Sequence, residues 1–193
     1  MKKILIKSLK ILLWIAVIWG LLTLIAELPG GSKIFDFGVE ENQPRAMVFY
    51  DPDPFYNLDE QVSKGIAEGL VEEGWHVKVA TVKAAKAMNL DADLYVFCAN
   101  TYNWAPDWAV TGMIKRTELA GKPVVAITLG SGSTYRSKRI LEARTQEKQA
   151  NLIDSETYWL MRPNDEERMD ERNVAVAVDM AHRLGRKVAG KLL

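Results

Sequence analysis

The chain has 193 residues, with 25 basic and 25 acidic side chains and a sequence pI of about 6.8. This balance gives no basic face for phosphate groups, so nucleic acid is excluded as an expected partner. The single cysteine, Cys98, excludes an intrachain disulfide and a cysteine-rich metal site, and its apolar neighbours predict a buried thiol on a strand.

The first clear pattern is an apolar stretch from Ile11 to Ala26, which only Gly20 and Thr23 interrupt. As a helix this stretch rises about 24 Å, close to the ~30 Å thickness of the hydrocarbon layer of a membrane. We predict that residues 1–28 form a cytoplasmic tip and an uncleaved transmembrane anchor. A cleaved signal peptide is the alternative, but Leu24-Ile25-Ala26 is a poor cleavage site.

Charged residues are distributed unequally around this anchor. Before it lie the basic residues Lys2, Lys3, Lys7 and Lys10. After it lie mostly acidic residues, Glu27, Asp36, Glu40 and Glu41, against Lys33 and Arg45. The positive-inside rule therefore places the N-terminus in the cytoplasm and the remainder of the chain outside it. Residues 29–44, which begin with Pro29 and two glycines, are predicted to be a juxtamembrane linker.

From residue 45 to 193, short apolar segments alternate with helical patterns. The predicted strands cover residues 46–50, 76–82, 94–99, 123–129 and 157–161. The predicted helices cover about 58–73, 108–116, 133–149 and 171–193. Strands that are apolar throughout and separated by helices indicate an α/β fold with a parallel sheet covered on both faces. A ligand of such a fold lies beyond the carboxyl ends of the strands.

The start and end of the first of these helices have local signals. Asn57, with Glu60 three residues later, matches a capping box. Gly74 is placed to end the helix in the left-handed conformation. The first signal places the N-terminus of the helix directly after the loop of residues 51–57.

Four segments of this region carry a family resemblance: IAEGLVEEGWHVKVATV, LDADLYVFCANTYNWAPDW, LAGKPVVAITLGSGST and WLMRPND before the last helix. In this order and spacing they resemble the flavodoxin and FMN-dependent reductase superfamily, over nearly all of residues 45–193. The resemblance implies one flavodoxin-like domain over residues 45–193, a three-layer sandwich around a five-stranded parallel sheet in the order 2-1-3-4-5. It also implies a noncovalent FMN site over the first and third strands.

One loop departs from the pattern of this family. The phosphate of FMN is usually held in a turn rich in hydroxyl groups and glycine between the first strand and the first helix. Here that turn runs from Asp51 to Asn57 and contains no serine, threonine or glycine, and its two prolines lack N–H donors. Asp51 and Asp53 stand where the phosphate would bind. A divalent cation held by these two carboxylates is one alternative, and a plain turn is the other.

The other two loops match the family better. The resemblance implies that Tyr102 and Trp104 flank a flavin ring. It also implies that the glycine-rich loop of residues 130–134 binds the polar edge of this ring. The implied cofactor-binding residues are Asn57, Thr101, Tyr102, Asn103, Trp104, Gly130, Ser131, Gly132 and Ser133. The alternatives are aromatic residues that cap the core and a tight turn with a helix N-cap.

Two hypotheses about function remain. In the first, the protein is a membrane-anchored flavoprotein that binds FMN for electron transfer, as a carrier or a reductase with an unknown redox partner, and no catalytic acid or base is required. In the second, the domain has lost FMN and serves as a non-catalytic, membrane-tethered binding or assembly module. The Asp51–Asn57 loop favours the second hypothesis. We adopt the first at this stage because the aromatic and glycine loops are retained together.

Overall fold

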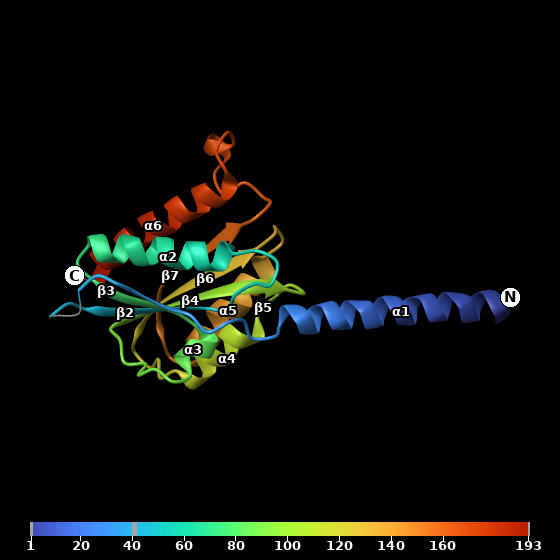
Figure 1. The fold of residues 1–193 in the computed structure, drawn as a ribbon. Helices are drawn as coiled ribbons and strands as arrows, with labels where there is room; N and C mark the ends of the chain where they lie inside the picture. Colours follow the sequence, from blue (N-terminus) through green and yellow to red (C-terminus); the bar gives the residue numbers. More distant parts are fainter. Residues whose placement is uncertain (1, 40–41, 193) are drawn as a thin grey trace.

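The computed structural model describes residues 2–39 and 42–192. Glu40, Glu41 and Leu193, which enter the charge count and the last predicted helix, lie outside the described residues. Helix α1 (Lys2–Ala26) projects from one edge of an α/β domain (Figure 1). Within the described chain, its segment Ile6–Ala26 is the one helix long and apolar enough to cross a membrane, and 6% of its apolar window is buried. The helix is therefore not part of a protein core.

The sheet follows the predicted topology. Its parallel strands lie in the order β3-β2-β4-β6-β7, which is the expected 2-1-3-4-5 order. These strands are β2 (Arg45–Tyr50), β3 (His76–Thr81), β4 (Leu94–Tyr102), β6 (Pro123–Gly130) and β7 (Asn151–Trp159). The expected total of five strands is wrong, because the sheet has seven strands within the described residues.

The two additional strands lie at the margins of the sheet. Strand β1 (Ile34–Phe37) pairs antiparallel with β3, and β5 (Ala105–Pro106) pairs antiparallel with the end of β4. An edge strand of four residues gives a weak sequence signal, because it is short, pairs with one neighbour and packs one face against the core. Because β1 lies within residues 29–44, that segment is tied to the sheet. The division into anchor, linker and domain stays a prediction.

Helices cover both faces of the sheet (Figure 1). Helices α2 (Leu58–Glu72) and α6 (Asn173–Leu192) lie on one face, and α3 (Val82–Ala85), α4 (Trp108–Arg116) and α5 (Tyr135–Glu147) lie on the other. Strand β2 shows how both faces of the sheet are buried. Val48 and Tyr50 point into the core under α2 and α6, whereas Met47 and Phe49 point into the core under α4. This alternation produces the continuous apolar segment that the sequence shows.

Some element boundaries differ from those predicted. Strand β4 continues to Tyr102, because its last residues pair with β5. Strand β7 begins at Asn151, six residues before the predicted start, because an edge strand tolerates the polar residues that precede Thr157. Helix α3 and the 3₁₀ turn Glu166–Arg168 were not predicted, since each is too short for a periodic pattern.

Candidate functional site

The candidate site is a cavity of about 370 Å³ at the carboxyl ends of β2, β4 and β6. The order of the strands along the chain reverses between β2 and β4, which is where ligands of open α/β sheets bind. The domain residues that line it are Asp53, Phe55, Tyr56, Leu58, Asn100, Thr101, Tyr102, Asn103, Gly130, Ser131 and Leu160. Helix α1 adds Trp19, Leu22, Thr23 and Ala26. Apolar and aromatic groups therefore dominate the wall.

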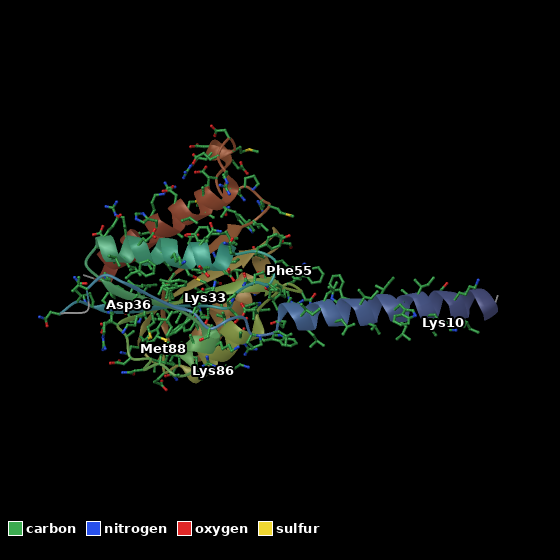
Figure 2. The ribbon with its side chains drawn as sticks, in the orientation of Figure 1. Lys10, Lys33, Asp36, Phe55, Lys86 and Met88 are labelled. Atoms are coloured by element: carbon green, nitrogen blue, oxygen red, sulfur yellow. The ribbon has the colours of Figure 1, made fainter. Side chains whose placement is uncertain are left out.

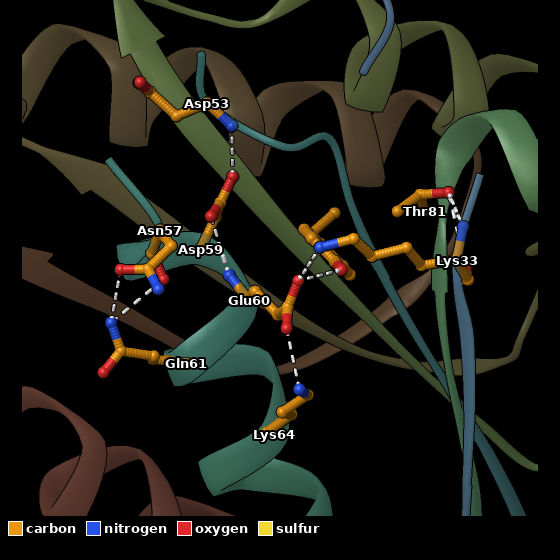
Figure 3. A network of polar contacts seen from close by, with 9 residues as sticks. Lys33, Asp53, Asn57, Asp59, Glu60, Gln61, Lys64 and Thr81 are labelled. Atoms are coloured by element: carbon orange, nitrogen blue, oxygen red, sulfur yellow. Dashed lines mark hydrogen bonds and ion pairs between the residues drawn. The ribbon is translucent and has the colours of Figure 1, made fainter. Parts of the chain in front are cut away.

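The loop between β2 and α2 binds its own carboxylates where a phosphate loop would bind an anion. Asp53 Oδ1 accepts hydrogen bonds from the backbone N–H of Phe55 at 2.7 Å and of Tyr56 at 3.0 Å. Asp59 Oδ2 accepts from the N–H of Asp53 at 2.6 Å, and Asp59 Oδ1 accepts from the N–H of Glu60 at 2.7 Å (Figure 3). Three N–H groups of the loop and that of Glu60 in the first turn of α2 are thus bound to the side chains of Asp53 and Asp59.

Asn57 is at the N-cap position of α2, but its side chain does not cap the helix. Its Oδ1 atom accepts a hydrogen bond from Gln61 Nε2 at 2.6 Å instead (Figure 3). The Glu60 carboxylate, which a capping box would direct back to Asn57, is held by Lys33 and Lys64, each at 2.7 Å. The predicted capping box is therefore wrong. Asn57 lines a hollow beside the main cavity, not the cavity itself.

Buried carboxylates surround the base of the site. Asp51, Asp59, Asp107 and Glu27 have between 1% and 8% of their surface exposed. None of them makes an ion pair within the described part of the chain. Burial raises the pKa of Asp51 and of Asp59 to about 6, and it also raises the pKa of Asp107 and of Glu27. None of the four lines the cavity, but burial without an ion pair already disfavours their charged forms, and an anion nearby would disfavour these forms further.

Asn100 connects the two main strands of the site. Its Nδ2 atom donates to the backbone oxygen of Asp51 at 2.9 Å and to Asp59 Oδ2 at 3.2 Å. Its own N–H donates to Asp107 Oδ2 at 2.8 Å. Sequence reasoning placed a ligand loop after β4 but did not include Asn100 among the site residues. The signal was its position as the first polar residue after the apolar run of that strand.

Tyr102 and Trp104 do not lie together on one cavity wall. Tyr102 lines the cavity, and its hydroxyl donates to Asp53 Oδ2 at 2.7 Å. Trp104 lines an adjoining hollow of about 200 Å³ with Trp19, Gly132 and Ser133. Asn103 and Trp104 form the two-residue turn that joins β4 to β5, and both residues have positive φ, 48° and 61°. The predicted pair of ring-flanking aromatics is therefore divided between two surfaces.

The loop after β6 is divided in the same way. Gly130 and Ser131 line the main cavity, whereas Gly132 and Ser133 line the adjoining hollow. A Cβ atom at Gly130 would come within 2.6 Å of Thr134 Cγ2, so this close turn requires glycine. Thr134 is the N-cap residue of α5, but its hydroxyl accepts from Trp159 Nε1 at 2.9 Å and makes no cap.

One polar group of the cavity wall is without a partner. Thr101 Oγ1 is buried and makes no hydrogen bond among the described residues, although Thr101 lines the main cavity. Buried hydroxyl groups nearly always have a partner, so an orphaned one beside a cavity is a position for a ligand or a water molecule. Thr101 Oγ1 itself has almost no accessible surface, so a ligand would reach it only after a small movement of the wall.

The FMN phosphate therefore does not fit the residues of this site. The donors that would hold the phosphate are bound to Asp53 and Asp59, and these carboxylates would repel it. The alternative of a cation between Asp51 and Asp53 finds no support in the geometry. The Asp51 carboxylate accepts from the N–H of Gly30 at 3.2 Å, away from the partners of Asp53, and no group of three or more acidic, histidine or cysteine residues in the described chain is placed to hold a metal ion.

Comparison with known proteins supports the fold and leaves the ligand open. No protein-family model and no curated protein matches the sequence. Among solved structures, an archaeal flavodoxin matches with a TM-score of 0.57 and 13% identity over 77% of this chain and 98% of its own. Flavodoxin 2 from Bacillus cereus matches with a TM-score of 0.56 and 16% identity, over 77% of this chain and 99% of its own.

A flavodiiron protein from Giardia intestinalis matches with a TM-score of 0.58 and 17% identity, over 78% of this chain and 37% of its own. Because all these identities are low, the likeness concerns the backbone. The chain has a flavodoxin-like fold, as the resemblance in the sequence implies.

Proposed function

We propose that the protein is a membrane-tethered binding domain of flavodoxin-like fold, whose cavity takes an uncharged or cationic small molecule and excludes FMN. The observation that carries this proposal is the state of the β2–α2 loop. Asp53 and Asp59 bind three N–H groups of the loop and the N–H of Glu60, so these donors have partners without a bound anion. A phosphate dianion would have to displace these carboxylates and then lie beside them.

The composition of the cavity supports an uncharged ligand. Phe55, Leu58 and Leu160 supply apolar surface, and Asn103 and Ser131 supply polar groups. Apolar cavities with a few convergent polar groups are the usual form of small-molecule sites. Asp53, the carboxylate in the cavity wall, adds a preference against anions, because like charges about 4 Å apart repel by ~1 kcal/mol even in water.

Electron transfer through FMN is the second candidate. It is favoured by Thr101, Tyr102, Gly130 and Ser131, which lie around the cavity where the resemblance implies the ring. In that case the phosphate would extend into solvent, away from the β2–α2 loop. FMN would then supply the redox chemistry, and the chain's residues would bind and orient it.

The absorbance spectrum of the purified full-length protein separates these candidates. Our proposal predicts a protein without the visible bands of a flavin. It also predicts no rise in melting temperature when FMN is added at millimolar concentration, since a ligand stabilises only the state that binds it. A yellow protein, or a melting temperature that rises with FMN concentration, would favour the electron carrier.

Tethering by an uncleaved α1, with the N-terminus in the cytoplasm, is also part of the proposal. It is supported by contacts between the end of α1 and the domain. Asn103 Nδ2 donates to Thr23 Oγ1 at 2.9 Å, and the N–H of Trp108 donates to Glu27 Oε2 at 2.7 Å. A signal peptide would take Thr23 away on cleavage. Protease added to intact cells should digest the domain, and a domain that is digested only after lysis would contradict the orientation.

A further inference from the structure

Large exposed apolar side chains gather at the carboxyl edge of the sheet, where α1 is attached. Phe55 lies between β2 and α2, Trp104 between β4 and β5, and Met161 two residues after the end of β7. Trp108 and Tyr135 are the first residues of α4 and α5. All five are between 53% and 74% exposed. Figure 2 shows Phe55 beside the C-terminal end of α1. We call these five residues the apolar rim.

Helix α1 joins the domain at this edge, and the path of the chain after the helix is fixed by contacts with the domain. Beyond the helix, the N–H of Gly30 donates to Asp51, and a Cβ atom at Gly30 would come within 2.6 Å of Pro52. The N–H of Lys33 donates to Thr81 Oγ1 at 3.1 Å, and its ammonium group pairs with Glu60. The chain after α1 is therefore not a free spacer that would hold the domain at a distance from the membrane.

The length of α1 places the rim at the membrane surface. Ile6–Ala26 is the apolar part of the helix. Its 21 residues rise about 30 Å, which equals the thickness of the hydrocarbon layer. Domain contacts reach back along α1 to Trp19, which lines both cavities at this edge. From Trp19 to Ala26 the helix rises about 10 Å. The loops that contact this part of α1 therefore lie at the membrane surface, at the level of the lipid headgroups.

Trp104 itself is difficult to explain by folding alone. Two-residue turns with positive φ at both positions favour Asn-Gly, and Asn103 satisfies the first position. A tryptophan at the second position is strained by about 1 kcal/mol or more. Its ring remains 53% exposed, so little burial offsets that strain. Tryptophan is, however, a side chain that stabilises protein at the membrane–water interface.

We propose that the apolar rim inserts into the interfacial layer of the bilayer that α1 crosses, so that the carboxyl edge of the domain lies on the membrane and the cavity opens onto lipid. The occupant of this surface is the bilayer itself, because α1 and the rim form one continuous apolar surface at one edge. The inference rests on α1 crossing the membrane and does not depend on the ligand of the cavity.

The test uses full-length protein in phosphatidylcholine vesicles, with one cysteine introduced as Trp104→Cys or Met161→Cys and labelled with a fluorophore. Val39→Cys is the matched control, since Val39 is 63% exposed and follows the end of β1 that lies at the amino edge of β3. Native Cys98 is fully buried, and burial raises the pKa of its thiol to about 12, so it does not compete for the label.

Lipids that carry a quencher near the headgroup should quench labels at positions 104 and 161 at least about threefold more strongly than at 39. Ten glycine and serine residues inserted after Leu28 test whether the rim binds by itself. Quenching at 161 should persist with this spacer and fall about twofold or more when Trp104→Ser and Trp108→Ser are added. Equal quenching at 39 and 161, disulfide-linked dimers through position 104, or release of the protein by alkaline washing would each overturn the inference.

Discussion

The variant Asp53→Asn is expected to bind FMN at least about tenfold more tightly than the native chain, while its affinity for riboflavin changes less than about twofold. Riboflavin carries the same ring without the phosphate, so the ratio of the two affinities reports the phosphate alone. Removing one charge about 4 Å from a dianion relieves ~1 kcal/mol per charge in water and more in a partly buried loop, and 1.4 kcal/mol is tenfold. Fluorescence titration of each flavin measures both affinities.

The loop should keep its conformation in this variant. An asparagine oxygen still accepts from the N–H groups of Phe55 and Tyr56, and its amide can donate to the hydroxyl oxygen of Tyr102. Asp91→Asn is the control, because Asp91 is exposed at the amino edge and the net charge changes equally. If both variants changed FMN affinity by the same factor, the effect would be one of overall charge, and the role given to Asp53 would be wrong.

The sequence predicted the central sheet well because its signals are local. Strands β2, β4 and β6 are apolar runs buried on both faces, and helices α2 and α6 repeat apolar residues at helical spacing. Strand β1 was missed for a physical reason. Phe35 and Phe37 pack against the core only because β3 offers an unpaired edge, and that edge cannot be seen from residues 34–37.

The site was predicted in outline but not in detail. The sequence indicated the correct edge of the sheet and identified Asp53 as an obstacle to a phosphate. It did not indicate that Asp53 and Asp59 bind the N–H groups of their own loop, because this depends on how the chain turns between Pro52 and Leu58. The sequence also did not indicate that Trp19 and Leu22 line the cavity. The apolar pattern of residues 11–26 predicts a membrane anchor and contains no signal for contact with the domain.

The buried carboxylates of the site oppose folding at neutral pH. Asp51 and Asp59 each lose hydration on folding without gaining a cation. An apolar or amide side chain of similar size would avoid this penalty. Residues that violate the local rules of stability commonly lie at functional sites. This argument supports a role for the acidic base of the cavity in selecting its ligand.

The free energy of unfolding should therefore rise by about 1–3 kcal/mol when the pH is lowered from 7 to 5. The pKa of Asp51 and of Asp59 is about 6 in the folded protein, against 3.8 for an ordinary aspartate. In this window the folded state binds more protons than the unfolded state, so stability falls as pH rises through 6. Glu60, whose pKa is lowered to about 2, has the opposite effect, but only below pH 4.5. Urea denaturation of the detergent-solubilised chain at several pH values measures the change.

The variant Asp51→Asn isolates one of these carboxylates. Its amide oxygen can still accept from the N–H of Gly30, so the contact with the chain after α1 is kept. At pH 7 the variant should be more stable than the native chain by about 1 kcal/mol, and this difference should vanish near pH 4. Glu118→Gln, at an exposed position on the opposite side of α4 from the site, should leave the slope unchanged. A native chain whose stability is constant or increases from pH 5 to 7, with Asp51→Asn showing the same profile, would mean that Asp51 is ionised in the folded protein without penalty, and the acidic base could not then act against anionic ligands.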